Sequence, residues 1–171
     1  MRGIRYTYRK KVRAMPQSQW IEAVTDRTAG DVQRVRELHK KGWKALSSEE
    51  RAEWIAGMKG ALNLQDLERI ENNIQVLSEL LELKTGAELR GIPEIPNTAY
   101  FSKLLSDVGM IREAYCIHEN TPHVPQMPLN DYQKINETER ILFDVYDIFN
   151  HNYHYFCGED LYAGEETGLL L

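Results

Sequence analysis

One stretch of the chain constrains its fold more than any other. Between positions 64 and 81, large apolar residues recur mostly at steps of three or four, the spacing of a single face of an α-helix. These residues are Leu64, Leu67, Ile70, Ile74, Leu77, Leu80 and Leu81. The other faces carry Glu68, Arg69, Glu71, Asn72 and Asn73. We therefore expect a long amphipathic helix with one buried stripe, capped by Asn63 and ending near Gly86.

Two shorter helices are predicted before this one by their capping residues. Thr28 is a good N-cap, and Asp31 lies three positions later, where its carboxylate can reach back to the cap backbone. Ser47 with Glu50 makes a second capping box, so a short helix should begin there. Gly42 marks the expected end of the first of these helices.

Two further helices are expected in the second half of the chain. One should run from about residue 97 to 115 and the other from about 130 to 151, with a proline-containing loop between them. Their inward faces are expected to include Phe101, Leu104, Leu105, Val108, Ile111, Ile135, Ile141, Leu142, Val145, Ile148 and Phe149. After these helices, several aromatic residues surround Gly158 and Gly164, which predicts a short turn or hairpin.

These patterns predict an all-α fold. We expect a bundle of about five helices with an extended basic N-terminal arm and a short C-terminal turn or hairpin. The arm spans residues 1–19 and one helical domain spans 20–171. If that domain divides in two, the connector at 86–97 is the expected boundary, because its two prolines, Pro93 and Pro96, oppose helix formation.

The charge of the chain is unevenly distributed. The first thirteen residues carry six basic side chains and no acid, a charge of +6, whereas the whole chain has a net charge of -5. The remainder therefore carries -11 and would repel phosphate, so only the arm could attract nucleic acid. Ile4, Tyr6 and Tyr8 alternate with polar residues at the period of a strand, which favours strand addition to another chain, with a disordered terminus as the alternative.

We expect the two termini to supply the contacts with neighbouring molecules. Aromatic and arginine side chains dominate interface energetics, and terminal segments have little core of their own to join. The candidate interface residues are Arg2, Arg5, Tyr6, Tyr8, Arg9, Lys10, Lys11, Arg13, Tyr153, Tyr155 and Tyr162. Trp43 and Trp54 are instead expected to pack the first helices together.

A search for reactive groups gives only weak patterns. Asp147, His151 and His154 share the spacing of one helical face, but histidines near a helix C-terminus are common because they suit its dipole. Glu137 and Glu139 are expected to form a solvated face. The chain contains no nucleophile elbow, phosphate-binding loop or dinucleotide fingerprint. We predict no catalytic residue, no bound metal, no cofactor and no enzymatic activity.

The cysteines and the apolar runs bear on the cellular compartment. Cys116 and Cys157 form no paired motif, so we expect reduced thiols that lie in or near the core. No apolar run approaches the roughly 20 residues needed to cross a bilayer. The sequence therefore predicts a protein made in the cytoplasm, without a membrane partner.

Two stretches resemble a family of small virion structural proteins encoded in the tail-gene clusters of Firmicutes phages and prophages. The first contains TDRT at 25–28, KGW at 41–43, EW at 53–54 and GMKGA at 57–61, followed by Asn63, Asp66, Leu67 and Arg69. The second contains GE at 158–159 and LYAGE at 161–165. The likeness covers about residues 20 to 165. Much of this likeness can be explained by helix caps, turns and packing within the fold. The residues concerned are Thr28, Asp31, Trp43, Trp54, Gly57, Gly60, Asn63 and Asp66.

The resemblance implies a non-enzymatic structural component of a bacteriophage tail, baseplate or virion. Its partners would be other tail or virion proteins, and we expect several copies to form a homo-oligomer within the assembly. The protein would be made in the cytoplasm of the host bacterium and reside in the virion. The alternative is a small regulatory nucleic-acid-binding protein that uses its basic arm, although the acidic remainder disfavours nucleic acid as a partner.

Overall fold

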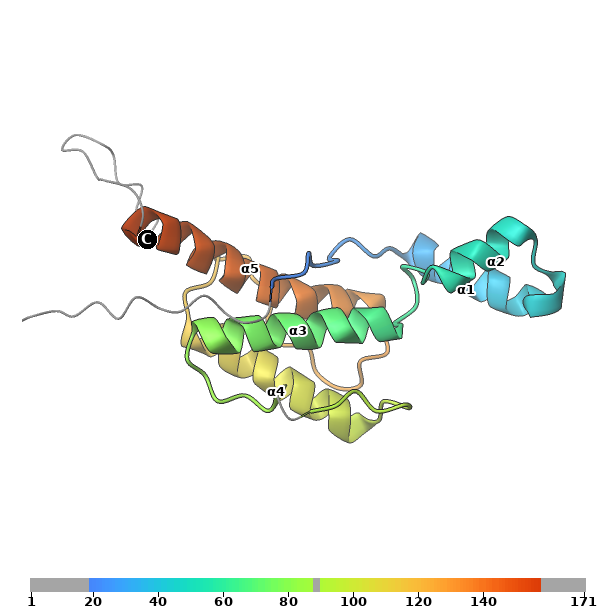
Figure 1. Cartoon of the computed structure of the whole chain (residues 1–171). Helices are drawn as coiled ribbons and strands as arrows, with labels where there is room; N and C mark the ends of the chain where they lie inside the picture. The colour runs from blue at the N-terminus through green and yellow to red at the C-terminus, as the bar shows by residue number, and fades with distance from the viewer. Residues whose placement is uncertain (1–18, 88–89, 158–171) are drawn as a thin grey trace, which may run out of the picture.

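Helices account for all regular secondary structure in the part of the chain that the structure describes (Figure 1). The computed structural model describes residues 19–87 and 90–157, and for 153–157 it describes the helical backbone alone. The elements are α1 (Ala29–Lys41), a 3-10 turn η1 (Trp43–Ala45), α2 (Ser48–Ile55), α3 (Leu64–Leu80), α4 (Thr98–Ala114) and α5 (Tyr132–Cys157). The prediction of an all-α protein with five helices is confirmed.

The helices form two groups that differ in size and position (Figure 1). Helices α3, α4 and α5 pack side by side, and we call them the bundle. Helices α1 and α2 with η1 project from one end of the bundle, and we call them the lobe. An extended segment, residues 19–28, runs along the bundle before it enters α1, and we call it the strap.

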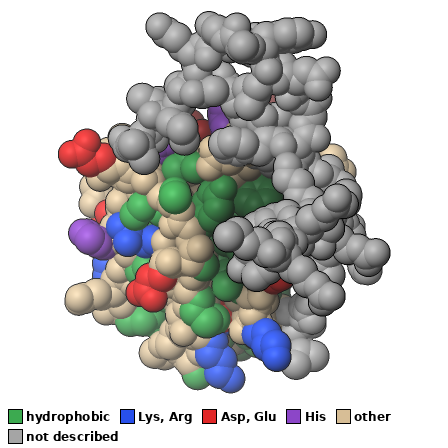
Figure 2. Space-filling model, turned by 90° about the vertical axis from the view of Figure 1, so that its left-hand side faces the viewer, with side chains coloured by type: hydrophobic (Ala, Val, Ile, Leu, Met, Phe, Trp, Pro, Cys, Tyr) green, Lys and Arg blue, Asp and Glu red, His purple; other side chains and the backbone are tan. Residues whose placement is uncertain are grey.

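The bundle contains the main hydrophobic core. All three helices contribute to it, so α3 and α4, which lie on either side of the proline connector, share one apolar interior. The most deeply buried apolar side chains include Ile74, Leu77, Leu104, Val108, Ile111, Ile141, Leu142 and Val145. Figure 2 views the end of the bundle opposite the lobe, where apolar side chains lie between the helix ends and most charged ones lie toward the edge.

The lobe has a small core of its own. Leu38 of α1, Leu46 and Met58 are buried together, and Val35 and Trp54 pack against them. This cluster is separate from the core of the bundle. The position of the lobe must therefore depend on the segments that connect it to the bundle.

The predicted capping boxes are present at the starts of three helices. At α1 the Thr28 side chain accepts a hydrogen bond from the backbone N–H of Asp31, whose carboxylate accepts one from the backbone N–H of Thr28. The same reciprocal pair is formed by Ser47 with Glu50 at α2 and by Asn63 with Asp66 at α3. Each pair satisfies two backbone donors that a helix start would otherwise leave free.

Helix α3 differs from its prediction at both ends. Leu64 is 58% exposed because it is the first residue of the helix and lies outside the packed stripe. The helix ends at Leu80 instead of near Gly86, because Glu82 adopts a positive φ of 56° and turns the chain away. Two polar residues placed on the outer faces, Glu71 and Asn73, are buried.

Helix α5 is longer than predicted and contains part of the expected hairpin. It continues past residue 151 to Cys157, so the backbones of Tyr153 and Tyr155 are helical and no hairpin begins there. No glycine or proline interrupts the chain before Gly158, which explains why the helix continues. The rest of the expected hairpin and the basic arm lie outside the described residues.

Two residues that were predicted to be buried, Trp43 and Cys116, are exposed. Trp43 is 51% exposed, because Gly42 turns the chain with a positive φ of 74° and η1 then presents this ring at the end of the lobe. Trp54 does pack in the lobe core as predicted. Cys116 is exposed in the loop after α4. None of the helices within 19–87 and 90–157 has the length and apolar character to span a membrane.

Candidate functional site

Two asparagine side chains fix the strap to the bundle through its backbone. Asn73 of α3 accepts a hydrogen bond from the N–H of Ile21 at 3.0 Å and donates one to its carbonyl oxygen at 2.7 Å. Asn136 of α5 accepts a hydrogen bond from the backbone N–H of Arg27 at 3.3 Å and donates one to its carbonyl oxygen at 2.9 Å. An amide side chain can pair with a backbone N–H and carbonyl at once, so both groups of each strap residue are satisfied.

The strap also follows α5 in the antiparallel direction. Arg27 lies beside Asn136, the Val24 N–H donates to the Glu139 carboxylate at 2.9 Å, and Trp20 stacks on Tyr146 with ring centroids 4.1 Å apart. Earlier strap residues thus lie against later residues of α5.

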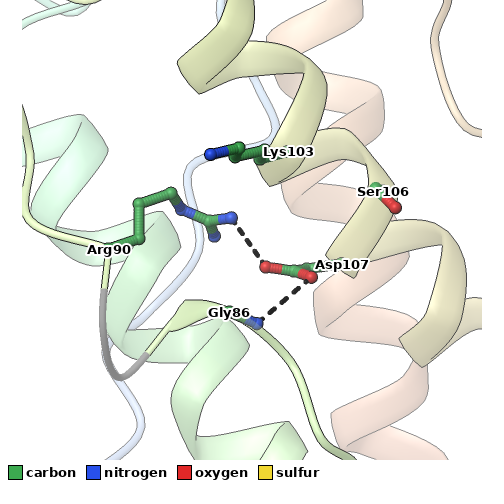
Figure 3. Close-up of a pocket in the computed structure, with 5 residues that line it drawn as sticks. All are labelled: Gly86, Arg90, Lys103, Ser106 and Asp107. Atoms are coloured by element: carbon green, nitrogen blue, oxygen red, sulfur yellow. Dashed lines mark hydrogen bonds and ion pairs between the residues drawn. The ribbon is translucent and has the colours of Figure 1, made fainter.

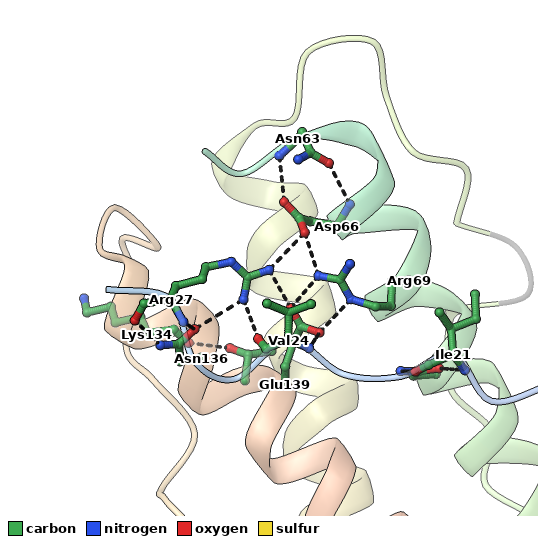
Figure 4. A network of polar contacts seen from close by, with 11 residues as sticks. Ile21, Val24, Arg27, Asn63, Asp66, Arg69, Lys134, Asn136 and Glu139 are labelled. Carbon is green, nitrogen blue, oxygen red and sulfur yellow. Dashed lines mark hydrogen bonds and ion pairs between the residues drawn. The ribbon is translucent and has the colours of Figure 1, made fainter. Parts of the chain in front are cut away.

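Four charged side chains meet where the strap, α3 and α5 converge, and three of them are buried while Arg69 is partly buried (Figure 4). Arg27 donates to Asp66 at 2.9 Å and to Glu139 at 2.8 Å, and Arg69 donates to the same two carboxylates at 2.6 and 2.8 Å. The Glu139 side chain is only 1% exposed and that of Arg27 only 3%. We call these four residues the junction; its two cations and two anions balance.

This arrangement makes the junction a rigid attachment point. Hydrogen bonds from Arg69 to Glu139, followed by those to Asp66, outweigh burial and raise the pKa of the Arg69 guanidinium. Taking charges out of water is costly unless geometry and pairing are good, and here each carboxylate accepts from both guanidinium groups. Removal of any one member would leave a buried charge without its partner.

The base of the lobe is held by two further contacts. Lys59, in the segment that returns from α2 to α3, forms a 2.6 Å ion pair with Asp26 of the strap. Gly60 lies so close to the backbone of Asp31 that a Cβ at this position would overlap the Asp31 carbonyl group. The strap and the return segment are therefore tied together at the point where the lobe meets the bundle.

The far end of the lobe presents an aromatic ring among basic side chains. The Arg51 guanidinium lies over the exposed Trp43 ring, 5.6 Å from its centroid. Lys40 and Lys44 flank Trp43 in sequence, are exposed, and form no ion pair within the described part of the chain. We call Lys40, Trp43, Lys44 and Arg51 the tip. An exposed tryptophan beside an arginine is typical of protein interfaces.

A second group of exposed apolar residues lies near the base of the lobe. Ile55 at the end of α2 is 72% exposed, and Leu62 and Leu64 flank the α3 cap at 37% and 58% exposure. A Cβ at Gly57 would lie 3.2 Å from the side chain of Asn63, so the end of α2 borders the start of α3. Large apolar side chains gathered in this way provide additional binding surface.

Polar side chains also line a hollow between α4 and the connector (Figure 3). Arg90 forms ion pairs with Glu71 at 2.8 Å and Asp107 at 2.7 Å. Burial alone would lower the pKa of Arg90, but the bonds to Glu71 and then to Asp107 together raise it. The hollow of about 410 Å³ is also lined by Lys103 and Ser106. Glu71 of α3 can be buried because its carboxylate is paired with the Arg90 guanidinium.

Two histidines, His118 and His151, approach the same carboxylate, that of Asp147. His151 Nδ1 lies 2.9 Å from the carbonyl oxygen and 3.3 Å from the carboxylate of Asp147, and His118 Nε2 lies 3.6 Å from that carboxylate. Over the described residues, no three histidine, cysteine or acidic side chains converge to hold a metal ion. The side chain of His154 lies outside the described residues.

The structure places the two sets of predicted site residues very differently. Thr28, Asp31, Gly60, Asn63 and Asp66 meet around the base of the lobe, and Asp66 is also a member of the junction. The arm residues and Tyr162 lie outside the described residues, as do the side chains of Tyr153 and Tyr155. Their role in an interface remains a prediction.

The junction itself was missed at the sequence level. Glu139 was assigned to a solvated face, which is wrong, since it is 1% exposed and bonded to two arginines. The sequence did contain an indication that Glu139 is buried. It lies four residues after Ile135 and three before Leu142, so it shares the buried face of the helix with them. Asn73 lies in the same way between Ile70 and Leu77.

The chain was also compared with known proteins. Comparison with protein-family models, with curated proteins and with solved structures found no significant match.

Proposed function

We propose that this protein is a non-enzymatic structural component of a bacteriophage tail, baseplate or virion that acts by binding other proteins. The proposal rests on the resemblance of two stretches, at 25–69 and 158–165, to a family of phage virion proteins. It places the protein in the virion, after synthesis in the cytoplasm of the host bacterium. Its partners are other tail or virion proteins, together with further copies of the chain.

The observation that carries a binding role is the projecting lobe. Its small core makes it a separate packing unit, and the junction holds that unit at a fixed place on the bundle. Its outer end exposes Trp43, and the nearby Lys40 and Lys44 form no ion pair with any residue that the structure describes. A rigid projection with an exposed aromatic anchor supports a docking role, because such residues contribute most of the energy of many interfaces.

The location is tested on purified phage particles. If the protein is a virion component, mass spectrometry of particles prepared from its host should detect it, and deletion of its gene should give particles with incomplete tails in electron micrographs. Particles that lack the protein, together with normal tails after gene deletion, would refute the proposal.

The binding role is tested with the products of the neighbouring genes. The purified full chain is mixed with each of them, and complexes are detected by size-exclusion chromatography with light scattering. Trp43→Ala should weaken the complex, whereas Met110→Ala, on the outer side of α4 and also exposed, serves as the control. A full set of neighbouring tail proteins with no binding would contradict the role.

A regulatory nucleic-acid-binding role is the second candidate, and the basic arm is the observation that favours it. Such binding would weaken steeply with salt, because neutralised phosphates release counterions. A variant that lacks residues 1–13 distinguishes the two roles. Loss of DNA binding favours regulation, whereas loss of assembly favours the virion role.

A further inference from the structure

The tip and the sequence that follows α5 contain side chains of opposite charge. At the tip, Arg51 lies over the exposed Trp43 ring, and Lys40 and Lys44 are exposed residues close to Trp43 in the sequence. Residues 158–171, which follow α5, contain Glu159, Asp160, Glu165 and Glu166 and no lysine or arginine, a charge of -4. We call this sequence the acidic segment. Leu161 and Tyr162 lie between its acids and add apolar and aromatic groups that suit a tryptophan.

The fold separates these complementary features. The lobe projects from one end of the bundle, and α5 ends at the other (Figure 1). From Asn136 at the junction to Cys157 the helix rises roughly 30 Å, and α1 extends roughly 20 Å in the opposite direction, so the tip lies about 50 Å from the end of α5. Nine extended residues, enough to reach Glu166, span only about 30 Å. The acids of one copy therefore cannot reach the tip of the same copy.

We propose that the tip is the docking surface for the acidic segment of a second copy of this chain. The inference rests on the proposed function, since it names a second copy as the partner of the lobe. The lysines attract the acids, and Leu161 and Tyr162 cover the Trp43 ring, which removes apolar surface from water. The contact joins two different surfaces, so the copies associate head to tail.

A head-to-tail contact has a consequence for assembly. Each copy keeps one free tip and one free acidic segment after the first contact forms, so further copies can add. Repetition of such a contact gives a closed ring if the rotation between copies closes, and an open filament if it does not. Both arrangements suit a tail component that occurs in several copies.

The experiment uses the full chain and three sets of substitutions at exposed or terminal positions. The tip variant carries Lys40→Gln, Trp43→Ala and Lys44→Gln. The tail variant carries Glu159→Gln, Asp160→Asn, Glu165→Gln and Glu166→Gln. The control variant neutralises part of the basic arm with Arg9→Gln, Lys10→Gln and Lys11→Gln. Circular dichroism verifies that each variant keeps its helical content.

Self-association is measured by sedimentation velocity over a range of concentration and salt. The wild-type protein should associate, and high salt should weaken the association because its charges are exposed. The tip and tail variants should each show a dissociation constant raised at least about tenfold, as expected for removal of an aromatic anchor or its charged partners. The arm variant should associate like the wild type.

Mixing gives the decisive result. The tip variant retains an intact acidic segment and the tail variant an intact tip, so an equimolar mixture should form dimers that do not grow further. A wild-type protein that remains monomeric overturns the proposal, as does a mixture that fails to associate. Loss of association in the arm variant, with the tip variant unaffected, assigns the acidic segment to the arm instead and also overturns it.

The result of this experiment can be distinguished from the result of the tests of the proposed function. Self-association is read on the purified chain alone, whereas the virion role is read on phage particles and on the products of neighbouring genes. A failure of one can therefore be told from a failure of the other.

Discussion

At the scale of single residues, the molecule depends on charges buried away from solvent. Glu139 accepts hydrogen bonds from Arg27, Arg69 and the backbone of Val24, so one carboxylate connects α3, α5 and the strap. An apolar residue could fill the same position in a helix core, but it could not bind two guanidinium groups. The charge at this position thus determines where the lobe is attached.

Removal of this carboxylate should be strongly destabilising. In Glu139→Ala, two buried guanidinium groups lose a shared partner, so the free energy of unfolding should fall by about 3–5 kcal/mol. Glu68→Ala, at an exposed position of α3, should change it by less than about 0.5 kcal/mol. Urea titrations followed by circular dichroism provide both values, and similar losses in the two variants would contradict the role assigned to Glu139.

Two glycines of the lobe should respond to alanine in opposite directions. A Cβ at Gly60 overlaps the Asp31 backbone, so Gly60→Ala should lower the free energy of unfolding by about 1–3 kcal/mol. Gly30 lies in the first turn of α1 with room for a methyl group, and Gly30→Ala should raise it by about 0.5–1 kcal/mol. Thermal melts of both variants test the difference in sign; a neutral Gly60→Ala would show that the close approach is not required.

At the scale of secondary-structure elements, the capping boxes make helix stability depend on pH. A hydrogen bond from the Thr28 hydroxyl lowers the pKa of Asp31, and one from Lys41 lowers the pKa of Glu50. A lowered pKa in the folded state means that the unfolded chain binds protons more readily. The stabilisation is therefore present above the unfolded pKa of about 4 and is lost as the pH falls through the folded value.

Because the pKa values of Asp31 and Glu50 are lowered in the folded state, the lobe should lose stability in acid. Between about pH 5 and pH 2 the free energy of unfolding should fall, and the double variant Asp31→Asn, Glu50→Gln should show a shallower decline because those carboxylates no longer take up protons. Denaturant titrations at a series of pH values measure both slopes. An unchanged slope in the double variant would show that the caps do not contribute to the acid response.

The elements that the sequence predicted well are those determined by neighbours along the chain. Caps at Thr28, Ser47 and Asn63 need only a partner three residues away, and apolar spacing identifies a helix without knowledge of its surroundings. The strap and the junction were missed because most of their contacts join residues far apart in the sequence, such as Arg27 and Glu139, which are 112 positions apart. The exposure of Trp43 was missed for the same reason, since its spacing is equally compatible with a small core.

At the scale of the whole molecule, two hydrophobic cores of unequal size are connected through polar contacts. The bundle core draws on three helices, whereas the lobe core has only Leu38, Leu46 and Met58 fully buried. The link between them includes the junction, the strap and the return segment. A unit with so few buried contacts is expected to open locally before the rest of the protein unfolds.

Truncation of one leucine in each core tests this division. Leu38→Ala removes the most buried side chain of the lobe, which should lower the stability of that unit by about 2–5 kcal/mol. Hydrogen exchange read by mass spectrometry should then show faster exchange in α1 and α2, while α3, α4 and α5 keep their protection. Leu77→Ala, in the bundle core, should instead speed exchange throughout, because the lobe has no support once the junction is lost. Uniform loss of protection in Leu38→Ala would mean that the junction couples the two cores into one cooperative unit.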